Sequence, residues 1–336
     1  MDRRGFLRGA CSAATVTIVC SGVSAAIPIK IGPAHIRDLR VSVDELYAKD
    51  QHVGGAALTD AALHQYRLVR RMLDEGDYDG SVGQQLMRMT GELAVCAGWL
   101  SYDGDNHIRA RQLYSEEFLL ADQAGDTALA VRAIEKMSLQ SAQLASKRSD
   151  RGLSREAVRL STRAVELARH DPSPRLHALL AGREAIAHAA VGDRHGFDTA
   201  IIRARREIDR AGCVEDEAVW LRFATPSEIT VHEAKGRSYL GDPDSASTLY
   251  RTCLEEPGLP PRNRANYQAQ MAATLAASGD EAEAISEALA VLPALEGKIA
   301  SPRTIAELRP VRQVAQDRGD EEFCDRYDAL STACCA

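Results

Sequence analysis

Short polar clusters that contain Gly, Asp, Asn or Ser interrupt the chain about every 20 residues, and this spacing constrains the fold most. Between the clusters, apolar residues recur at intervals of three and four, as Leu86, Met89, Leu93, Ala97 and Leu100 do. Glycine suits the end of a helix, and Asp, Asn or Ser suits the start of the next. The pattern therefore predicts successive antiparallel helix pairs from about residue 33 onward.

Small residues recur where the second helix of each expected pair would pack against the first. These residues are Ala110, Ala157, Ala200, Ala246 and Ala284, at intervals longer than a standard repeat. Alanine also favours helix formation, and aromatic residues make up only 5% of the chain. We therefore expect an all-α protein, a tetratricopeptide-like α-solenoid that covers residues 31–336. Residues 1–30 form a separate segment.

The net charge of −7 argues against direct DNA binding, which usually uses a basic face. Arginine alternates with Asp and Glu along the chain, as on solvated helix faces. The eight cysteines include no C-x-x-C pair and are scattered, which favours free thiols in a reducing compartment.

No motif in the sequence indicates a metal, a cofactor or a catalytic centre, and we expect a protein that is not an enzyme. His232-Glu233 begins like a zinc-binding H-E-x-x-H motif, but Gly236 occupies the position of the second histidine. His188 and His195 are separated by a Gly-Asp turn and do not share a helix face. These histidines are expected to be surface or partly packed residues.

A solenoid presents a concave groove lined by its first helices, and a protein or peptide partner is expected there. Asn263, Arg264, Asn266 and Tyr267 lie near the start of one such helix. An asparagine amide can hold an extended backbone through its donor and its acceptor. A helix cap is the alternative role of Asn263.

Aromatic residues on another first helix, Trp99 and Tyr102, are further candidates for partner contact, with core packing as the alternative. Asn106 is expected to cap the next helix. The stretch from Trp220 to Pro226 is expected to be a packed loop, with a hinge as the alternative, and Thr225 would cap the helix that Pro226 begins.

The N-terminal residues Arg3, Arg4, Phe6 and Leu7 are typical of a twin-arginine export signal. The apolar stretch that follows is too short and too polar for a membrane span. Near the other end, Phe323, Tyr327 and Leu330 form an apolar stripe, expected to pack in the core of a terminal cap, with a homo-oligomer contact as the alternative.

Several runs of sequence resemble the tetratricopeptide-like region of actinobacterial helix-turn-helix transcriptional regulators, especially those of Streptomyces. The resemblance covers roughly residues 30–320 and is carried by the runs at 41–58, 92–114, 137–148, 175–193 and 279–292. In that family a short R-R-x-F-L stretch often follows a DNA-binding domain, which this sequence is without. The resemblance therefore implies that residues 1–30 are a vestigial linker and that the protein is cytoplasmic.

The resemblance also implies a non-catalytic regulatory protein that modulates transcription, secondary metabolism or development through a partner. One alternative is a helical scaffold or binding protein exported by the twin-arginine route. Another is an enzyme of a biosynthetic cluster built on a helical scaffold.

Overall fold

A computed structural model describes residues 30–212 and 218–334 of the chain. The predicted export-signal residues Arg3, Arg4, Phe6 and Leu7 lie outside these ranges. All regular elements in the described ranges are helical, which confirms the all-α prediction. They are α1 (Pro33–Val53), α2 (Thr59–Glu75), α3 (Gly80–Asp103), α4 (His107–Ala124), α5 (Thr127–Arg148), α6 (Arg151–Leu167), α7 (Pro174–Ala190), α8 (Arg194–Ala211), the short 3₁₀ helix η1 (Val219–Leu221), α9 (Pro226–Tyr239), α10 (Pro243–Leu254), α11 (Pro261–Ser278), α12 (Glu281–Gly297), α13 (Pro302–Glu307), α14 (Arg309–Arg318) and α15 (Glu321–Ala333).

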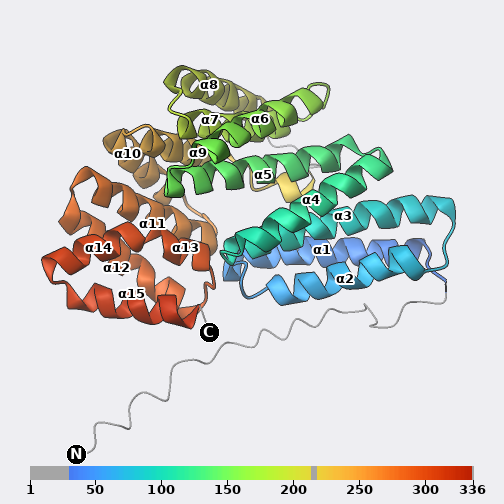
Figure 1. Ribbon diagram of the computed structural model, residues 1–336, viewed down its shortest axis with the longest axis horizontal. Helices are drawn as coiled ribbons and strands as arrows, with labels where there is room; N and C mark the ends of the chain where they lie inside the picture. The colour runs from blue at the N-terminus through green and yellow to red at the C-terminus, as the bar shows by residue number, and fades with distance from the viewer. Residues whose placement is uncertain (1–29, 213–217, 335–336) are drawn as a thin grey trace, which may run out of the picture.

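Consecutive helices pack in pairs, namely α3 with α4, α5 with α6, α7 with α8, α9 with α10, and α11 with α12. The helices α1, α3, α5, α7, α9 and α11 also contact one another in that order, and α11 returns to contact α1. We call these six helices the inner ring. Figure 1 shows the C-terminal helices in red next to the blue N-terminal helices, with α5 to α10 above both. The helical repeat array therefore closes on itself.

The small residues predicted on second helices lie where the sequence pattern placed them. Ala110, Ala157, Ala200, Ala246 and Ala284 fall on α4, α6, α8, α10 and α12, and each is at most 3% exposed. Because alanine adds little bulk, the paired helices can approach closely. The repeat spacing inferred from the sequence is thus a packing feature of the folded chain.

The polar clusters between helices act as caps. Asn106 accepts a hydrogen bond from the backbone N–H of Arg109, as expected of an N-cap. Thr225 likewise caps α9, with Pro226 as its first residue. At the other end of a helix, Gly125 and Gly279 adopt the left-handed conformation that ends α4 and α11. Local sequence therefore fixes where these helices begin and end.

The segment from Trp220 to Pro226 is a packed loop, as predicted. Leu221 and Ala224 are buried in a cluster with residues of α5, α6 and α7, and η1 contacts α1. Trp220 and Phe223 are half-buried. The loop thus lies across the inner ring.

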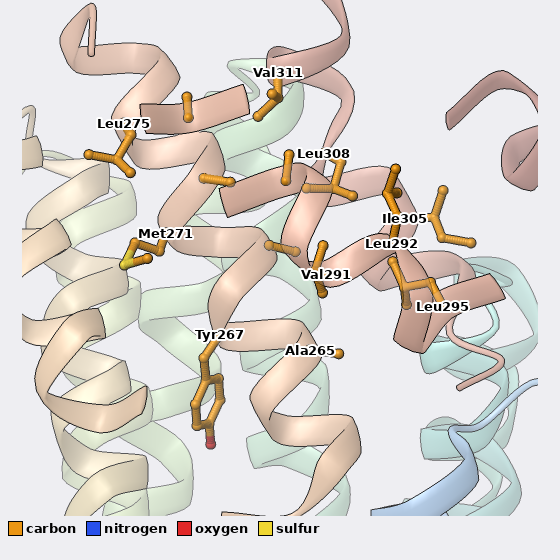
Figure 2. Packing of buried hydrophobic residues seen from close by; sticks show 14 of the residues in the cluster. Ala265, Tyr267, Met271, Leu275, Val291, Leu292, Leu295, Ile305, Leu308 and Val311 are labelled. Atoms are coloured by element: carbon orange, nitrogen blue, oxygen red, sulfur yellow. The ribbon is translucent and has the colours of Figure 1, made fainter. Parts of the chain in front are cut away.

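The last helices form the largest apolar cluster of the described residues. Figure 2 shows Leu292, Leu308 and Val311 gathered between α11, α12, α13 and α14, while the hydroxyl of Tyr267 points away from this group. Phe323 and Tyr327 of the predicted apolar stripe are buried in the same cluster. The stripe therefore packs in the core.

The array closes at a contact that we call the seam, where the loop before α13 meets the loop after α1. The backbone N–H of Ala300 donates to the carbonyl of Val53 at 2.8 Å, and the N–H of Ala56 donates to the carbonyl of Ala300 at 3.1 Å. Gly54 has a φ of +81°, and a side chain there would meet the backbone of Ala300. A Gly-Gly turn therefore allows the two ends of the array to approach.

Candidate functional site

The inner ring encloses a chamber of about 90 Å³. Its lining comes from α1, α3, α5, α7, α9, α11 and α13 and from the loop around η1. The second helices of the pairs contribute nothing to this lining among the described residues. The first helices of the pairs therefore line a chamber that is partly open to solvent.

One network of charges connects α5, α7 and α9 across the chamber. The guanidinium of Arg183 donates from Nε to Glu135 Oε2 at 2.9 Å, and Nζ of Lys136 lies 2.8 Å from Glu135 Oε1. Burial alone would raise the pKa of Glu135, but the Lys136 and Arg183 cations outweigh it and lower that pKa below its ordinary value. Glu135 is therefore a carboxylate that holds two cations in place.

His232 extends this network. Its Nε2 lies 2.7 Å from Nη1 of Arg183, and since a guanidinium can only donate, Nε2 accepts. Burial and the Arg183 cation lower the pKa of His232, while Glu228 Oε1, 3.2 Å from the same Nε2, acts in the opposite direction. Beside it, the Tyr267 hydroxyl donates to Glu228 at 2.6 Å.

A second cluster, at α1, α3 and α11, is built around Asp50, which is 1% exposed. The indole N–H of Trp99 donates to Asp50 Oδ2 at 3.0 Å, and Arg262 pairs with the same oxygen. The Arg262 guanidinium also lies 5.4 Å from the centre of the Trp99 ring. This cluster joins the first helix of the array to its last pair.

A third cluster lies at the seam. Arg303 donates to Asp103 Oδ1 from Nε at 3.1 Å and from Nη2 at 2.8 Å, and both side chains are buried. The N–H of Gly55 donates to the other oxygen of Asp103 at 2.7 Å. A carboxylate with this many donors stays ionised in the interior.

Cations also lie over the aromatic rings of the chamber. Lys136 Nζ is 4.7 Å from the ring centre of Trp99 and 5.0 Å from that of Phe223. Arg132 stacks on Trp220 at 4.7 Å and donates to the hydroxyl of Tyr47 at 3.0 Å. Such contacts stabilise a partly desolvated cation.

Lys235, on α9, differs from the other cations of the lining. It is 9% exposed, and among the described residues its ammonium has no ion-pair or hydrogen-bond partner. Burial lowers the pKa of Lys235 to about 8. It is the cation of the chamber that is freest to meet a ligand.

The structure brings most of the sequence-predicted partner residues into this chamber. Trp99, Tyr102, Asn263, Asn266 and Tyr267 all line it. The side-chain amide of Asn266 is engaged in hydrogen bonds within the protein, since it donates to Thr304 at 3.1 Å and accepts from Gln270 at 2.5 Å. The aromatic residues are buried or half-buried, and they serve both packing and lining.

Two expectations for the start of α11 need correction. Asn263 does not cap the helix, since Pro260 occupies the N-cap position and Asn263 is the third helical residue. Arg264 lies outside the chamber and is exposed; its guanidinium donates to the backbone carbonyls of Leu254 and Glu256. Of this group, Asn263 is therefore a half-buried chamber residue.

The expectation that His232 is a surface or partly packed residue is wrong, because it is 2% exposed. Sequence reasoning also missed Arg183 and Lys235 as site residues. The available signal was a row of charged side chains at helical spacing on one first helix, as for Arg132, Glu135 and Lys136. Alternating charges of this kind predict a solvated helix face, and the pattern alone does not show that these positions lie at a chamber.

Within 30–212 and 218–334, no group of three or more His, Cys, Asp or Glu side chains could hold a metal ion. In the same ranges, none of the helices has the length and apolar character that crossing a membrane requires.

Comparisons with known proteins give a weak likeness in fold alone. No protein-family model matches the chain, and no curated protein matches it. Among solved structures, it is similar to a circular tandem repeat protein with novel repeat topology and enhanced subunit contact surfaces. That likeness has 15% sequence identity and a TM-score of 0.24, and covers 90% of this chain and 71% of the other. The assignment as a helical repeat fold rests on the helix contacts described above.

Proposed function

We propose that this chain is a non-catalytic regulatory protein that acts by binding a protein partner. The proposal rests on the helical repeat array itself, since such arrays present extended surfaces that commonly bind other proteins. The resemblance to actinobacterial regulators supports a role in transcription, secondary metabolism or development.

A concave groove for a peptide stays a prediction. Drug-sized ligands occupy pockets of roughly 300–1,000 Å³, and the chamber is smaller than that range. An extended peptide of several residues would therefore require the inner ring to open. We place the protein contact on the outer helices instead.

The outer helix α4 carries the best candidate surface. Ile108 is 76% exposed and Leu119 is 57% exposed, although both are large and apolar. Their separation corresponds to about three helical turns, so they share one side of the helix. Phe118 beside them is also exposed. Exposed apolar side chains grouped on one element are typical of protein interaction surfaces.

The charged chamber residues support a non-catalytic role. Asp50, Asp103 and Glu135 are each tied to an arginine on another helix, so they hold the ring together. The cations beside Asp103 and Glu135 lower the pKa of each carboxyl, and a carboxylate with a lowered affinity for a proton is a poor general base.

Affinity capture from cells that naturally express the protein tests the proposal. We expect wild-type protein to retain a specific partner, and the Ile108→Ser/Leu119→Ser variant to lose it. Val41→Ser is the matched control, since Val41 is 58% exposed on α1 and lies on a different helix. Equal capture by both variants would exclude the α4 surface, and absence of any specific partner would contradict the proposed function.

A further inference from the structure

The chamber holds more positive than negative charge. Six cationic side chains line it, namely Arg132, Lys136, Arg183, Lys235, Arg262 and Arg303. The carboxylates that line or directly bind them are Asp50, Asp103, Glu135 and Glu228. The cations therefore outnumber the carboxylates by two, and a buried excess of this sign favours an anionic ligand.

The excess charge belongs to Lys235 and Arg132. Among the described residues, neither has a carboxylate in ion-pair distance. Glu307 is the carboxylate whose charge acts most strongly on Lys235. It pairs with Lys147 at 3.2 Å and accepts a hydrogen bond from Gln143 at 2.8 Å. Glu117 and Glu92 act on Arg132 and raise its pKa, so its charge is better compensated than that of Lys235.

Polar atoms without a partner also collect at this chamber. They are Asp50 Oδ1, Tyr102 Oη, Gln143 Oε1, His232 Nδ1 and Arg262 Nε, all on buried side chains. Buried polar groups in proteins are nearly always satisfied, and a cluster of exceptions is typical of a functional site. The chamber thus differs from a purely structural network, in which donors and acceptors match.

The rest of the lining includes apolar side chains, both aliphatic and aromatic. Leu139, Ile186 and Val231 contribute aliphatic surface, and Trp99 and Phe223 contribute aromatic rings. The volume of about 90 Å³ is several times the roughly 10–15 Å³ that one water needs. A small organic molecule with a flat apolar body suits this space and this lining.

We propose that the chamber binds a small organic carboxylate, with its carboxylate against Lys235 and its apolar body against the apolar side chains of the lining. Lys235 on α9, a residue that is 9% exposed, supplies the charge-assisted hydrogen bond that selects an anion. This inference is independent of the partner surface on α4, since the two sites use different helices.

Isothermal titration calorimetry with benzoate tests the proposal, and benzamide is the neutral probe of the same shape. We expect benzoate to bind with a Kd of about 1 mM or lower. Lys235→Met should weaken benzoate binding by about ten- to a hundredfold, the range for a hydrogen bond to a charged group. Lys298→Met, at an exposed lysine outside the chamber, should bind as wild type does.

The outcomes separate the alternatives. Equal affinity for benzoate and benzamide would overturn the proposal, as would unchanged binding by Lys235→Met or absence of benzoate binding to wild type. Tighter binding of inorganic phosphate than of benzoate would overturn the assignment of an organic carboxylate. Circular dichroism of each variant confirms that it is folded.

A spectroscopic measurement locates the anion without a variant in the chamber. The chain has six lysines, Lys30, Lys49, Lys136, Lys147, Lys235 and Lys298, so protein labelled with ¹³C at lysine Cε gives few signals. We expect one signal to titrate near pH 8 and to move to higher pH with benzoate, because a bound carboxylate stabilises the ammonium. A Lys235 signal that does not respond to benzoate would contradict the site.

Discussion

Two kinds of helix contact build this molecule, and they differ in chemistry. Neighbouring helices along the array meet through alanines such as Ala157 and Ala246, which are fully buried. The two ends of the array meet through buried ion pairs, Arg303 with Asp103 at the seam and Arg262 with Asp50 between α11 and α1. The contacts within a helix pair are thus small and apolar, whereas the contacts that close the array include buried charges.

The two kinds of contact differ in how strictly they determine which segments of the chain pair with each other. Alanine contacts tolerate many partners, and the short connections between helices choose the right one. At the seam, Asp103 and Arg303 are 200 positions apart in the chain, and matching charges and hydrogen bonds help to select that pairing. A buried ion pair gives little net stability, but it penalises every arrangement that leaves one charge alone.

The largest expected effect comes from breaking the charge match at the seam. Arg303→Met leaves the carboxylate of Asp103 buried without its cation, and we expect a loss of about 3–5 kcal/mol of unfolding free energy. Chemical denaturation followed by circular dichroism measures the loss. Arg303→Met combined with Asp103→Asn should recover part of it, because the uncompensated charge is gone.

An exposed ion pair provides the control for that variant. Arg312→Met removes the partner of Asp328, whose side chain is 54% exposed, and should lower the unfolding free energy far less than Arg303→Met does. Similar losses for Arg303→Met and Arg312→Met would show that the seam does not depend on its charges.

The chamber allows the opposite test, in which removal of a charge stabilises the fold. The pKa of Lys235 is about 8, against an ordinary 10.5, so holding its ammonium in the folded state is unfavourable below pH 8. Lys235→Met should therefore raise the unfolding free energy at pH 7, by an amount on the order of 2–3 kcal/mol.

The pH dependence gives the sign of this effect. A lowered folded pKa means that wild type gains stability as pH rises from about 8 toward 10.5, so its deficit relative to Lys235→Met should shrink over that window. Glu307, Arg303, Lys147 and Arg183 also act on this ammonium and are unchanged between the two proteins. A constant difference from pH 7 to pH 10 would mean that Lys235 does not titrate there.

A side chain at Gly55 of the seam is expected to lower the unfolding free energy by about 2 kcal/mol. A Cβ added at Gly55 would lie 2.6 Å from Cβ of Asp103 and 2.7 Å from the carbonyl oxygen of Leu100, so Gly55→Ala must displace one side of the seam. Gly80→Ala is the matched control, because its Cβ would meet nothing within 4 Å. Thermal unfolding should separate the two variants, and equal melting temperatures would contradict the close approach.

The sequence predicted the array well, because its determinants are local. Helix period, capping residues such as Asn106 and Thr225, and the second-helix alanines each depend on a few neighbouring positions. The loop from Trp220 to Pro226 was predicted for the same reason. Trp99, Asn263 and Tyr267 line the chamber because they lie on first helices, and their contact with a partner stays a prediction.

The closure of the array and the charged chamber could not be predicted in this way. Asp50 pairs with Arg262 from 212 positions away, and nothing in the sequence near either residue indicates the other. Glu135, Arg183 and Lys235 have the same residue types and the same helical spacing as solvated surface. Their burial depends on the ring closing, which is a property of the whole array.

The smallest expected effects distinguish the two asparagines of α11. Asn266→Ala removes two hydrogen bonds, to Thr304 of α13 and to Gln270, and should cost about 1 kcal/mol. Asn263→Ala should stay within about 0.5 kcal/mol of wild type, because Asn263 is half-buried at the chamber. Denaturation of the two single variants measures the difference. Equal losses would mean that Asn263 also has a structural role, whereas the expected split makes Asn263→Ala the cleaner probe of ligand binding, since it would change the chamber without loosening the contact between α11 and α13.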